Sequence, residues 1–339
     1  MGNISQQWIN PRKASQSFPP YELANQELIQ ATEEKTRKLR RIYHIAQDNA
    51  WDGRKVLGEL VEKHGGIHVP EDKKEALGKV ASILLWGELA AWSISADIAL
   101  KLDDMDAKMA ASSQVFDEAR HFYVLRDYLW QAGIEVPKLG GFSRKLLVDL
   151  LETDNLLYKL VGMQLLVENT AVALFKTIGK ANIEPVLSEL FVYYERDEAR
   201  HVGLGVLALP NILADMSRRE AVGLWLFQTK IHLLMMGGGM TMREHFDALG
   251  VNQAELQKYG FRLQKQVFAE MRGTTERKAN QSRTKGLFRL NRDGQERINN
   301  FLFPKQPEAE LHPLHMPTLR SLVKLADAGD RWLRARSPV

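Results

Sequence analysis

The five-residue sequence Asp-Glu-Ala-Arg-His occurs twice in this chain, ending at His121 and at His201. Each copy contains a Glu-x-x-His pair, and a spacing of three residues places both side chains on one face of a helix. A carboxylate and an imidazole that share a face can bind a metal ion together. A single Glu-x-x-His is weak evidence, because exposed helices with salt bridges contain it often. The repetition therefore needs support from a second feature.

Two isolated glutamates provide that support. Glu88 is the one charged residue of VASILLWGELAAWSISA, and Glu168 is the one charged residue of LVGMQLLVENTAVALF. Burying an unpaired carboxylate costs on the order of several kcal/mol, so such a group is protonated, paired with a cation or bound to a metal. Glu88 and Glu168 are 80 residues apart, as are the histidines and glutamates of the repeated sequence. The chain therefore contains two copies of one helix pair.

Four antiparallel helices built from these two copies would bring four carboxylates and two imidazoles to one place. The candidate metal ligands are Glu88, Glu118, His121, Glu168, Glu198 and His201. Ferritin-like di-iron and di-manganese bundles use this set of ligands. Oxygen-rich ligation with one histidine per metal suits iron or manganese better than zinc or copper, and the absence of cysteine excludes thiolate sites. We predict a site for two iron ions, with a Mn/Fe pair as the alternative.

Two aspartates are expected to orient the histidines. A metal-bound histidine usually donates its second ring N–H to a carboxylate or carbonyl group. Asp117 and Asp197 each precede a candidate ligand and point about a quarter-turn away from it, toward the neighbouring motif helix. We predict a crossed arrangement in which Asp117 holds His201 and Asp197 holds His121.

Three further charged residues lie close to the candidate ligands in the sequence. Arg120 and Arg200 could neutralise the two aspartates, although ordinary surface salt bridges are an alternative interpretation of both. Glu195 breaks the symmetry of the repeat, because its counterpart 80 residues earlier is Val115. It lies three residues before Glu198, on the same helix face, so it could be a proton relay or an extra ligand. Pairing with a lysine or arginine is equally compatible with its position.

The pattern of apolar residues predicts an all-α fold, with a ferritin-like four-helix bundle core and additional N- and C-terminal helices. From residue 21 to 209 the chain is rich in helix-forming residues and shows little of the alternation typical of strands. We expect helices over 21–48, 72–102, from 106 to 130, over 143–178 and from 184 to 210. A capping box at Ser217 and Glu220 predicts a further helix, which we expect to end at the glycines 237–239.

Composition divides the chain into three predicted regions. Residues 1–20 form a polar N-terminal leader, 21–272 a helical domain with the metal-binding bundle at about 72–210, and 273–339 a basic segment, irregular with short helices. Residues 260–339 contain 16 Lys/Arg against 8 Asp/Glu, whereas the whole chain has a net charge of +4. No nucleic-acid module accompanies this charge, so a solvated surface is the preferred interpretation. No signal peptide or uninterrupted membrane span is visible, which predicts a cytoplasmic protein.

The motifs resemble those of the ferritin-like di-iron carboxylate superfamily, of the ribonucleotide-reductase-small-subunit and bacterial monooxygenase type. The resemblance covers about residues 72–210 and is carried by the six candidate ligands together with the aspartates and arginines of both repeats. It implies an oxidoreductase, a monooxygenase or oxidase, that activates O₂ and oxidises a small organic substrate by hydroxylation, desaturation or N-oxygenation. In the reductase branch a radical tyrosine follows the first ligand histidine by four residues. This position is Leu125 here, which argues against a reductase role.

The resemblance also implies partners and alternatives. No flavin, nicotinamide or iron–sulfur motif is present, so an external donor, a ferredoxin or a reductase, is expected to supply electrons, with the basic C-terminal region as a docking surface. The oligomeric state stays open, with a homodimer as one option. A metal-handling or ferroxidase protein without an organic substrate is the main alternative function. A helical scaffold that has lost its chemistry is disfavoured, because all six ligands are present.

Overall fold

The computed structural model describes residues 34–214, 217–279 and 316–334. Within these ranges the chain forms helices and no strand, which confirms the predicted all-α class. The predicted leader at 1–20 and most of the basic segment at 273–339 lie outside the described residues. The division into three regions therefore stays a prediction.

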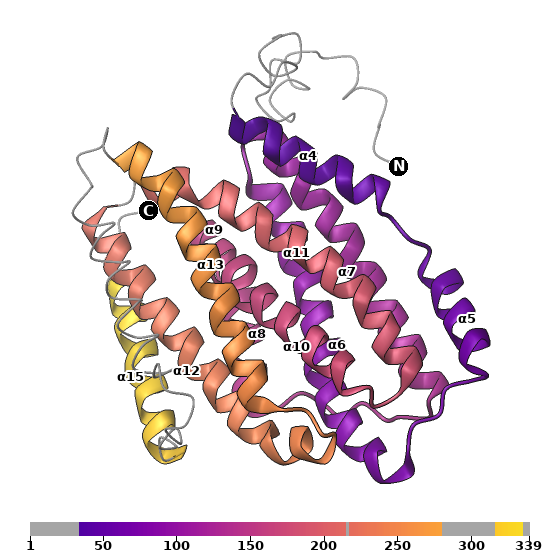
Figure 1. Cartoon of the computed structure of the whole chain (residues 1–339). Coiled ribbons are helices and arrows are strands. Elements are labelled where there is room, and N and C mark those ends of the chain that lie inside the picture. The colour runs from indigo at the N-terminus through magenta and orange to yellow at the C-terminus, as the bar shows by residue number, and fades with distance from the viewer. Residues whose placement is uncertain (1–33, 215–216, 280–315, 335–339) are drawn as a thin grey trace, which may run out of the picture.

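The core is a bundle of long helices: α6 (Glu71–Lys101), α7 (Met105–Gln131), α10 (Glu168–Ala181) and α11 (Pro185–Ala214). Figure 1 shows them side by side, with α6 packed on α7 and α10 packed on α11. Local signals set their ends. The Asp104 side chain caps the first turn of α7 by accepting from the backbone N–H of Ala107, and α10 ends where Asn182 adopts a left-handed conformation. The predicted pairing of the helices is confirmed, and the ends of α6, α7 and α11 agree with the prediction within a few residues.

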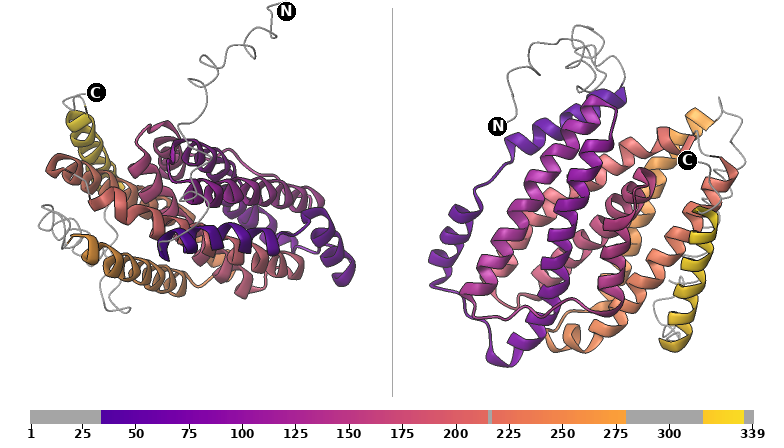
Figure 2. Two further views of the ribbon diagram at one scale, coloured as in Figure 1. Left: turned by 90° about the horizontal axis from the view of Figure 1, so that it is seen from above. Right: turned by 180° about the vertical axis from the view of Figure 1, so that it is seen from behind.

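Two helices cover one side of this bundle. α4 (Glu34–Asp48) packs on α7 and α11, and the Arg40 guanidinium pairs with Asp106 at 2.8 Å. α5 (Gly53–His64), which the sequence analysis did not predict, packs on α11 and α7. The Asp52 carboxylate accepts two backbone N–H groups at its start, and Gly65 ends it with a positive φ of 70°. In Figure 2 α5 lies at the opposite end of the molecule from α12 and α15.

The segment before Glu168 is more broken than expected. Instead of one helix over 143–178, the chain forms α8 (Gly141–Glu152), the short α9 (Leu156–Lys159) and a π-helix, η1 (Leu160–Val167). The predicted single helix is wrong because the Asn155 side chain accepts from the backbone N–H of Tyr158 and starts a new helix there. The π-helix ends directly at the candidate ligand Glu168, and such segments are frequent at functional sites.

Three C-terminal helices complete the described fold. α12 (Arg218–Ala248) begins with the predicted capping box, in which Ser217 and Glu220 satisfy each other's backbone N–H groups. The predicted end of this helix at residues 237–239 is wrong. A Cβ at Gly237 would lie 2.6 Å from the Phe142 ring, so the glycine allows α12 to pack closely on α8 rather than ending the helix. α13 (Gln253–Ala279) packs on α11 and α10, and α15 (Met316–Arg334) packs on α12.

One described helix, α6, has the length and composition that would suffice to cross a membrane. Of its most apolar window, 39% is buried inside the chain, and core helices of soluble proteins pass the same test. Its single central charge, Glu88, is buried within the bundle. A membrane span therefore has only weak support, and its absence stays a prediction.

Candidate metal centre

Six side chains from four helices meet inside the bundle. α6 supplies Glu88, α7 supplies Glu118 and His121, α10 supplies Glu168, and α11 supplies Glu198 and His201. All six are at most 5% exposed. They form two groups of four, within each of which the candidate ligand atoms lie within 4.8 Å of one another. The first group is Glu88, Glu118, His121 and Glu198, and the second is Glu118, Glu168, Glu198 and His201.

Both histidines turn the same ring nitrogen toward the carboxylates. His121 Nδ1 lies 3.2 Å from Glu198 Oε1 and 3.4 Å from Glu88 Oε2. His201 Nδ1 lies 2.8 Å from Glu198 Oε2 and 3.1 Å from Glu118 Oε1. Glu118 and Glu198 therefore face both histidines. They are also the two residues that belong to both groups of four.

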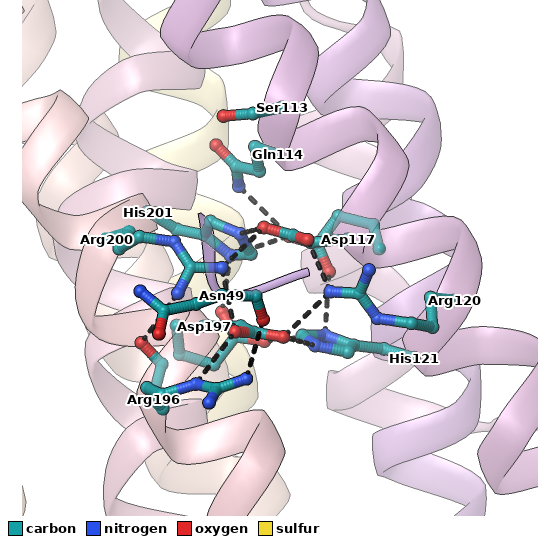
Figure 3. Close-up of polar contacts among 12 residues, drawn as sticks. Asn49, Ser113, Gln114, Asp117, Arg120, His121, Arg196, Asp197, Arg200 and His201 are labelled. Carbon is teal, nitrogen blue, oxygen red and sulfur yellow. Dashed lines mark hydrogen bonds and ion pairs between the residues drawn. The ribbon is translucent and has the colours of Figure 1, made fainter. Parts of the chain in front are cut away.

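The opposite ring nitrogens face the two aspartates in the predicted crossed arrangement, as Figure 3 shows. His121 Nε2 lies 3.2 Å from Asp197 Oδ2, and His201 Nε2 lies 3.3 Å from Asp117 Oδ2. A carboxylate beside Nε2 favours the tautomer in which this nitrogen carries the proton. When the imidazole is neutral, Nδ1 is left with a lone pair that points at the cluster, as a metal ligand requires.

Two arginines join the aspartates into one neutral network. The Nη2 group of Arg120 donates to Asp117 and, at 2.9 Å, to Asp197. The Nη2 group of Arg200 donates to Asp117 at 2.9 Å and to Asp197 at 2.7 Å. Both arginines are buried, so the alternative of surface salt bridges is wrong. Two guanidinium charges balance two carboxylates, which fixes the aspartates without adding negative charge beside the cluster.

Burial and crowding shift the pKa values of the clustered groups in different directions. Burial raises the pKa of Glu88 and of Glu168 well above the usual value, and the neighbouring carboxylates raise both further. Burial also acts to raise the pKa of Glu118, but His201 and His121 outweigh it and lower that pKa. Burial acts to lower the pKa of His121, but Asp197 and the surrounding glutamates raise it well above its usual value. The cluster therefore holds protons tightly until another cation replaces them.

Atoms without hydrogen-bond partners show that a cation fits this cluster. Glu88 Oε2, Glu118 Oε2 and His121 Nδ1 are buried and have no hydrogen-bond partner. Acceptor atoms that face one another in a dry interior repel unless a proton or a metal ion lies between them. The nitrogen and oxygen donors match the preferences of iron and manganese. The cluster is therefore able to hold two metal ions.

Trp51, in the turn before α5, also contacts the site and was not predicted from the sequence. Its indole N–H donates to Asp197 Oδ2 at 2.7 Å, and the Arg120 guanidinium lies 4.6 Å from the centre of its ring. A chain of contacts therefore runs from the half-buried Trp51 through Asp197 to His121. Trp51 lies outside the repeat, so no spacing in the sequence connected it with the site.

The residues one helical turn before Glu118 and Glu198 were also missed. Gln114 Nε2 donates to Glu118 Oε1 at 3.0 Å and to Glu168 Oε1 at 2.8 Å. Tyr194 stacks on His121 with ring centres 4.2 Å apart and donates its hydroxyl to the His121 carbonyl at 2.6 Å. These two residues are 80 apart, so the repeat spacing was the signal that could have found them.

Glu195 lies outside both four-ligand groups. It pairs with the Lys176 ammonium at 2.8 Å, and the same ammonium donates to the Tyr259 hydroxyl at 3.0 Å. Its side chain is 29% exposed, unlike those of the clustered glutamates. The structure therefore places Glu195 in the ion pair that was one of the two open interpretations, with Lys176 as the partner.

Comparison with known proteins supports the fold. No protein-family model and no curated protein matches the chain. A solved variant of an R2-like ligand-binding oxidase with an aerobically reconstituted Mn/Fe cofactor is similar at a TM-score of 0.55 and 16% identity, covering 73% of this chain and 98% of the other. Another structure of an R2-like ligand-binding oxidase with this cofactor, after a long soak, gives a TM-score of 0.54 and 14% identity over 76% and 98%. The chain therefore has the ferritin-like fold of the R2-like ligand-binding oxidases.

Proposed function

We propose that this protein is a dimetal oxidase or oxygenase, which uses O₂ to oxidise a small organic substrate. The observation that carries the proposal is the pair of four-ligand groups buried inside the bundle, which share Glu118 and Glu198. Metal ions held by these residues would be able to act together on one small molecule. The six residues predicted from the sequence are the proposed ligands.

Iron is the proposed metal, with a Mn/Fe pair as the alternative. The similar structures are of oxidases with a Mn/Fe cofactor, and the donor set here contains the same nitrogen and oxygen types that both metals accept. When bound, the metal pair would supply the redox and Lewis-acid chemistry that O₂ activation needs. The protein would supply geometry, protons and a dry environment.

The residues around the cluster have separate tasks in this proposal. Asp117 and Asp197 hold the two histidines so that Nδ1 points inward. Arg120 and Arg200 keep those aspartates charged and in place. The buried cluster excludes water, which strengthens each electrostatic contact inside it. No other redox cofactor motif is present in the sequence, so electrons must come from an external donor protein.

Metal content after substitution tests the ligand assignment. Glu118→Ala removes a carboxylate that belongs to both groups, so we expect it to lose both metal ions and all metal-dependent activity. His201→Ala removes a ligand of one group only, so we expect about one equivalent of metal to remain. Iron per chain by elemental analysis, with helical content by circular dichroism, measures both effects. Full metal content in either variant would contradict the assignment.

Glu195→Gln is the matched control, because Glu195 lies one turn from Glu198 on the same helix but pairs with Lys176. We expect it to keep two metal ions per chain. The same measurement of iron per chain distinguishes the proposed oxidase from the alternative function of metal handling. An iron content far above two per chain after aerobic loading would favour storage, whereas a plateau at two supports the oxidase.

A further inference from the structure

The two halves of the repeat differ at the positions one turn before the ligand glutamates. Gln114 on α7 corresponds to Tyr194 on α11, and Gln164 on η1 corresponds to Leu84 on α6, each pair being 80 residues apart. The helix pairs are antiparallel, so the two glutamines lie toward one end of the cluster. Tyr194 and Leu84 lie toward the other. We call these the amide end and the aromatic end.

The glutamines are linked to the cluster in a fixed order. Once a metal ion has displaced their protons, the carboxylates of Glu118 and Glu168 can only accept, so Gln114 must turn its NH₂ group toward them, as it does in the structure. Its carbonyl oxygen then accepts from the NH₂ group of Gln164. Each amide therefore has one orientation, which the carboxylates impose. This chain of hydrogen bonds, which we call the amide relay, ends at the carbonyl oxygen of Gln164.

That last oxygen is an acceptor without a partner. Gln164 is fully buried, and its Oε1 atom has no hydrogen-bond partner. Most buried acceptors in native proteins have a partner, so this oxygen is available to a donor from a water molecule or a ligand. A Cβ at Gly205 would lie 2.5 Å from the Gln164 Cβ. The glycine therefore allows the backbone of α11 to pack directly against the base of the Gln164 side chain.

The aromatic end offers no equivalent group. The Tyr194 hydroxyl is already used by the His121 carbonyl, and Leu84 has no polar atom. The side chains of Phe175 and Phe191 pack on the Tyr194 ring, with ring centres 5.1 and 5.8 Å away. A ligand with a hydrogen-bond donor can therefore bind the free acceptor at the amide end. Tyr194, Leu84, Phe175 and Phe191 offer it no free acceptor at the aromatic end.

We propose that the Gln114–Gln164 pair is a specificity determinant, which selects substrates that carry an O–H or N–H donor and seats that donor on Gln164 Oε1 beside the metal pair. The inference rests on the proposed function and deepens it. Because the carboxylates set the orientation of both amides, the site cannot turn to offer a donor instead. Molecules that present only acceptors or apolar groups are disfavoured there. Gln164 lies on the π-helix η1, which continues directly into α10. The proposed substrate-binding residue Gln164 and the candidate metal ligand Glu168 therefore belong to one continuous segment.

Matched probes test the inference on the iron-loaded full chain under anaerobic conditions. Phenol, benzyl alcohol and 1-hexanol carry a donor, whereas anisole, toluene and 1-fluorohexane are similar in size and lack one. We expect the donor probes to bind the wild type more tightly by titration calorimetry. Gln164→Met keeps the length of the side chain and removes the amide, so it should reduce this preference about three- to tenfold. Gln164→Leu should reduce the donor preference by a similar factor. It serves as a second variant if Gln164→Met does not fold.

Gln228→Met is the matched control. Gln228 on α12 is also buried with an unpartnered carbonyl oxygen, but it lies outside the ligand helices. We expect it to leave the donor preference unchanged. Equal binding of donor and matched probes to the wild type, the absence of binding by any probe, or an unchanged preference in both Gln164 variants would overturn the inference. A wild type that holds no metal pair would instead overturn the proposed function, so metal content measured on each sample distinguishes the two failures.

Discussion

The aromatic end and the amide end of the cluster are built from the same repeat but serve different purposes. At the aromatic end the Tyr194 ring stacks on His121 and packs against the buried rings of Phe175 and Phe191, which carry no polar atom. At the amide end Gln114 and Gln164 form a relay with one unpartnered acceptor. The aromatic end resembles an ordinary protein core, whereas the amide end carries an acceptor that could bind a polar group of the proposed substrate.

This difference shows how a duplicated helix pair can become a one-sided site. The six candidate ligands keep the symmetry of the repeat, because two cations need similar surroundings. The residues one turn away are free to differ, and they place two amides on one side of the cluster and an aromatic ring on the other. Stability is expected to depend more on the aromatic end, and selectivity more on the amide end.

The largest effect on stability is expected from Phe175→Ala. Phe175 is 1% exposed and packs on Phe191 and Tyr194 with ring centres 4.9 and 5.1 Å away. Removing a buried phenylalanine leaves a cavity and costs about 3–5 kcal/mol. Urea unfolding of the metal-free protein measures the loss. Val192→Ala, at an exposed position of α11, is the control and should change the free energy of unfolding by less than about 0.5 kcal/mol.

Proton release on metal binding tests whether Glu88 and Glu168 hold protons in the metal-free cluster. Burial raises the pKa of Glu88 and of Glu168, so each binds a proton more tightly than a free carboxyl group does. A metal ion must displace these protons, so its affinity falls as the pH is lowered, by about tenfold per pH unit for each proton released. Calorimetry in buffers of different ionisation enthalpy counts the protons. Glu88→Gln should release fewer protons per metal ion bound, and an identical count per ion would contradict the raised pKa of Glu88.

The main features of the fold and the candidate ligands could be predicted from the sequence. The isolated charges Glu88 and Glu168 lie in apolar runs, and a fixed 80-residue spacing relates them to the two Glu-x-x-His pairs. Both signals depend on helical periodicity and on the cost of burying charge, which hold along the chain without knowledge of tertiary contacts. The crossed aspartates followed for the same reason, since a quarter-turn on a helix sets their direction.

The features that were missed depend on contacts between distant segments. Trp51 reaches Asp197 across 146 residues of sequence, and nothing local marks that contact. Gly237 suggests a helix end in the sequence, and only its close contact with Phe142 in the structure explains why a glycine lies inside α12. The amide relay joins Gln114 to Gln164 across 50 residues, and each glutamine alone looks like an ordinary polar residue of a helix.

A smaller effect is expected from Tyr194→Phe at the aromatic end. The change removes the hydroxyl that donates to the His121 carbonyl and keeps the ring that stacks on His121. Losing one buried neutral hydrogen bond costs about 0.5–1.5 kcal/mol. Metal content should stay at the wild-type value, because the ring still holds the imidazole. Loss of metal from this variant would show that the aromatic end also takes part in ligation.

The smallest effect on stability is expected from Gln164→Met, at the amide end. The substitution breaks the hydrogen bond to Gln114 and leaves the buried Gln114 carbonyl oxygen without this donor, which acts to destabilise the fold. It also removes the unpartnered buried acceptor of Gln164, which acts in the opposite direction. The two contributions nearly cancel, so the free energy of unfolding should change by less than about 1 kcal/mol. The same urea titration used for Phe175→Ala measures both variants. A loss as large as that of Phe175→Ala would mean that the glutamine pair supports the fold, and the contrast between the two ends would then disappear.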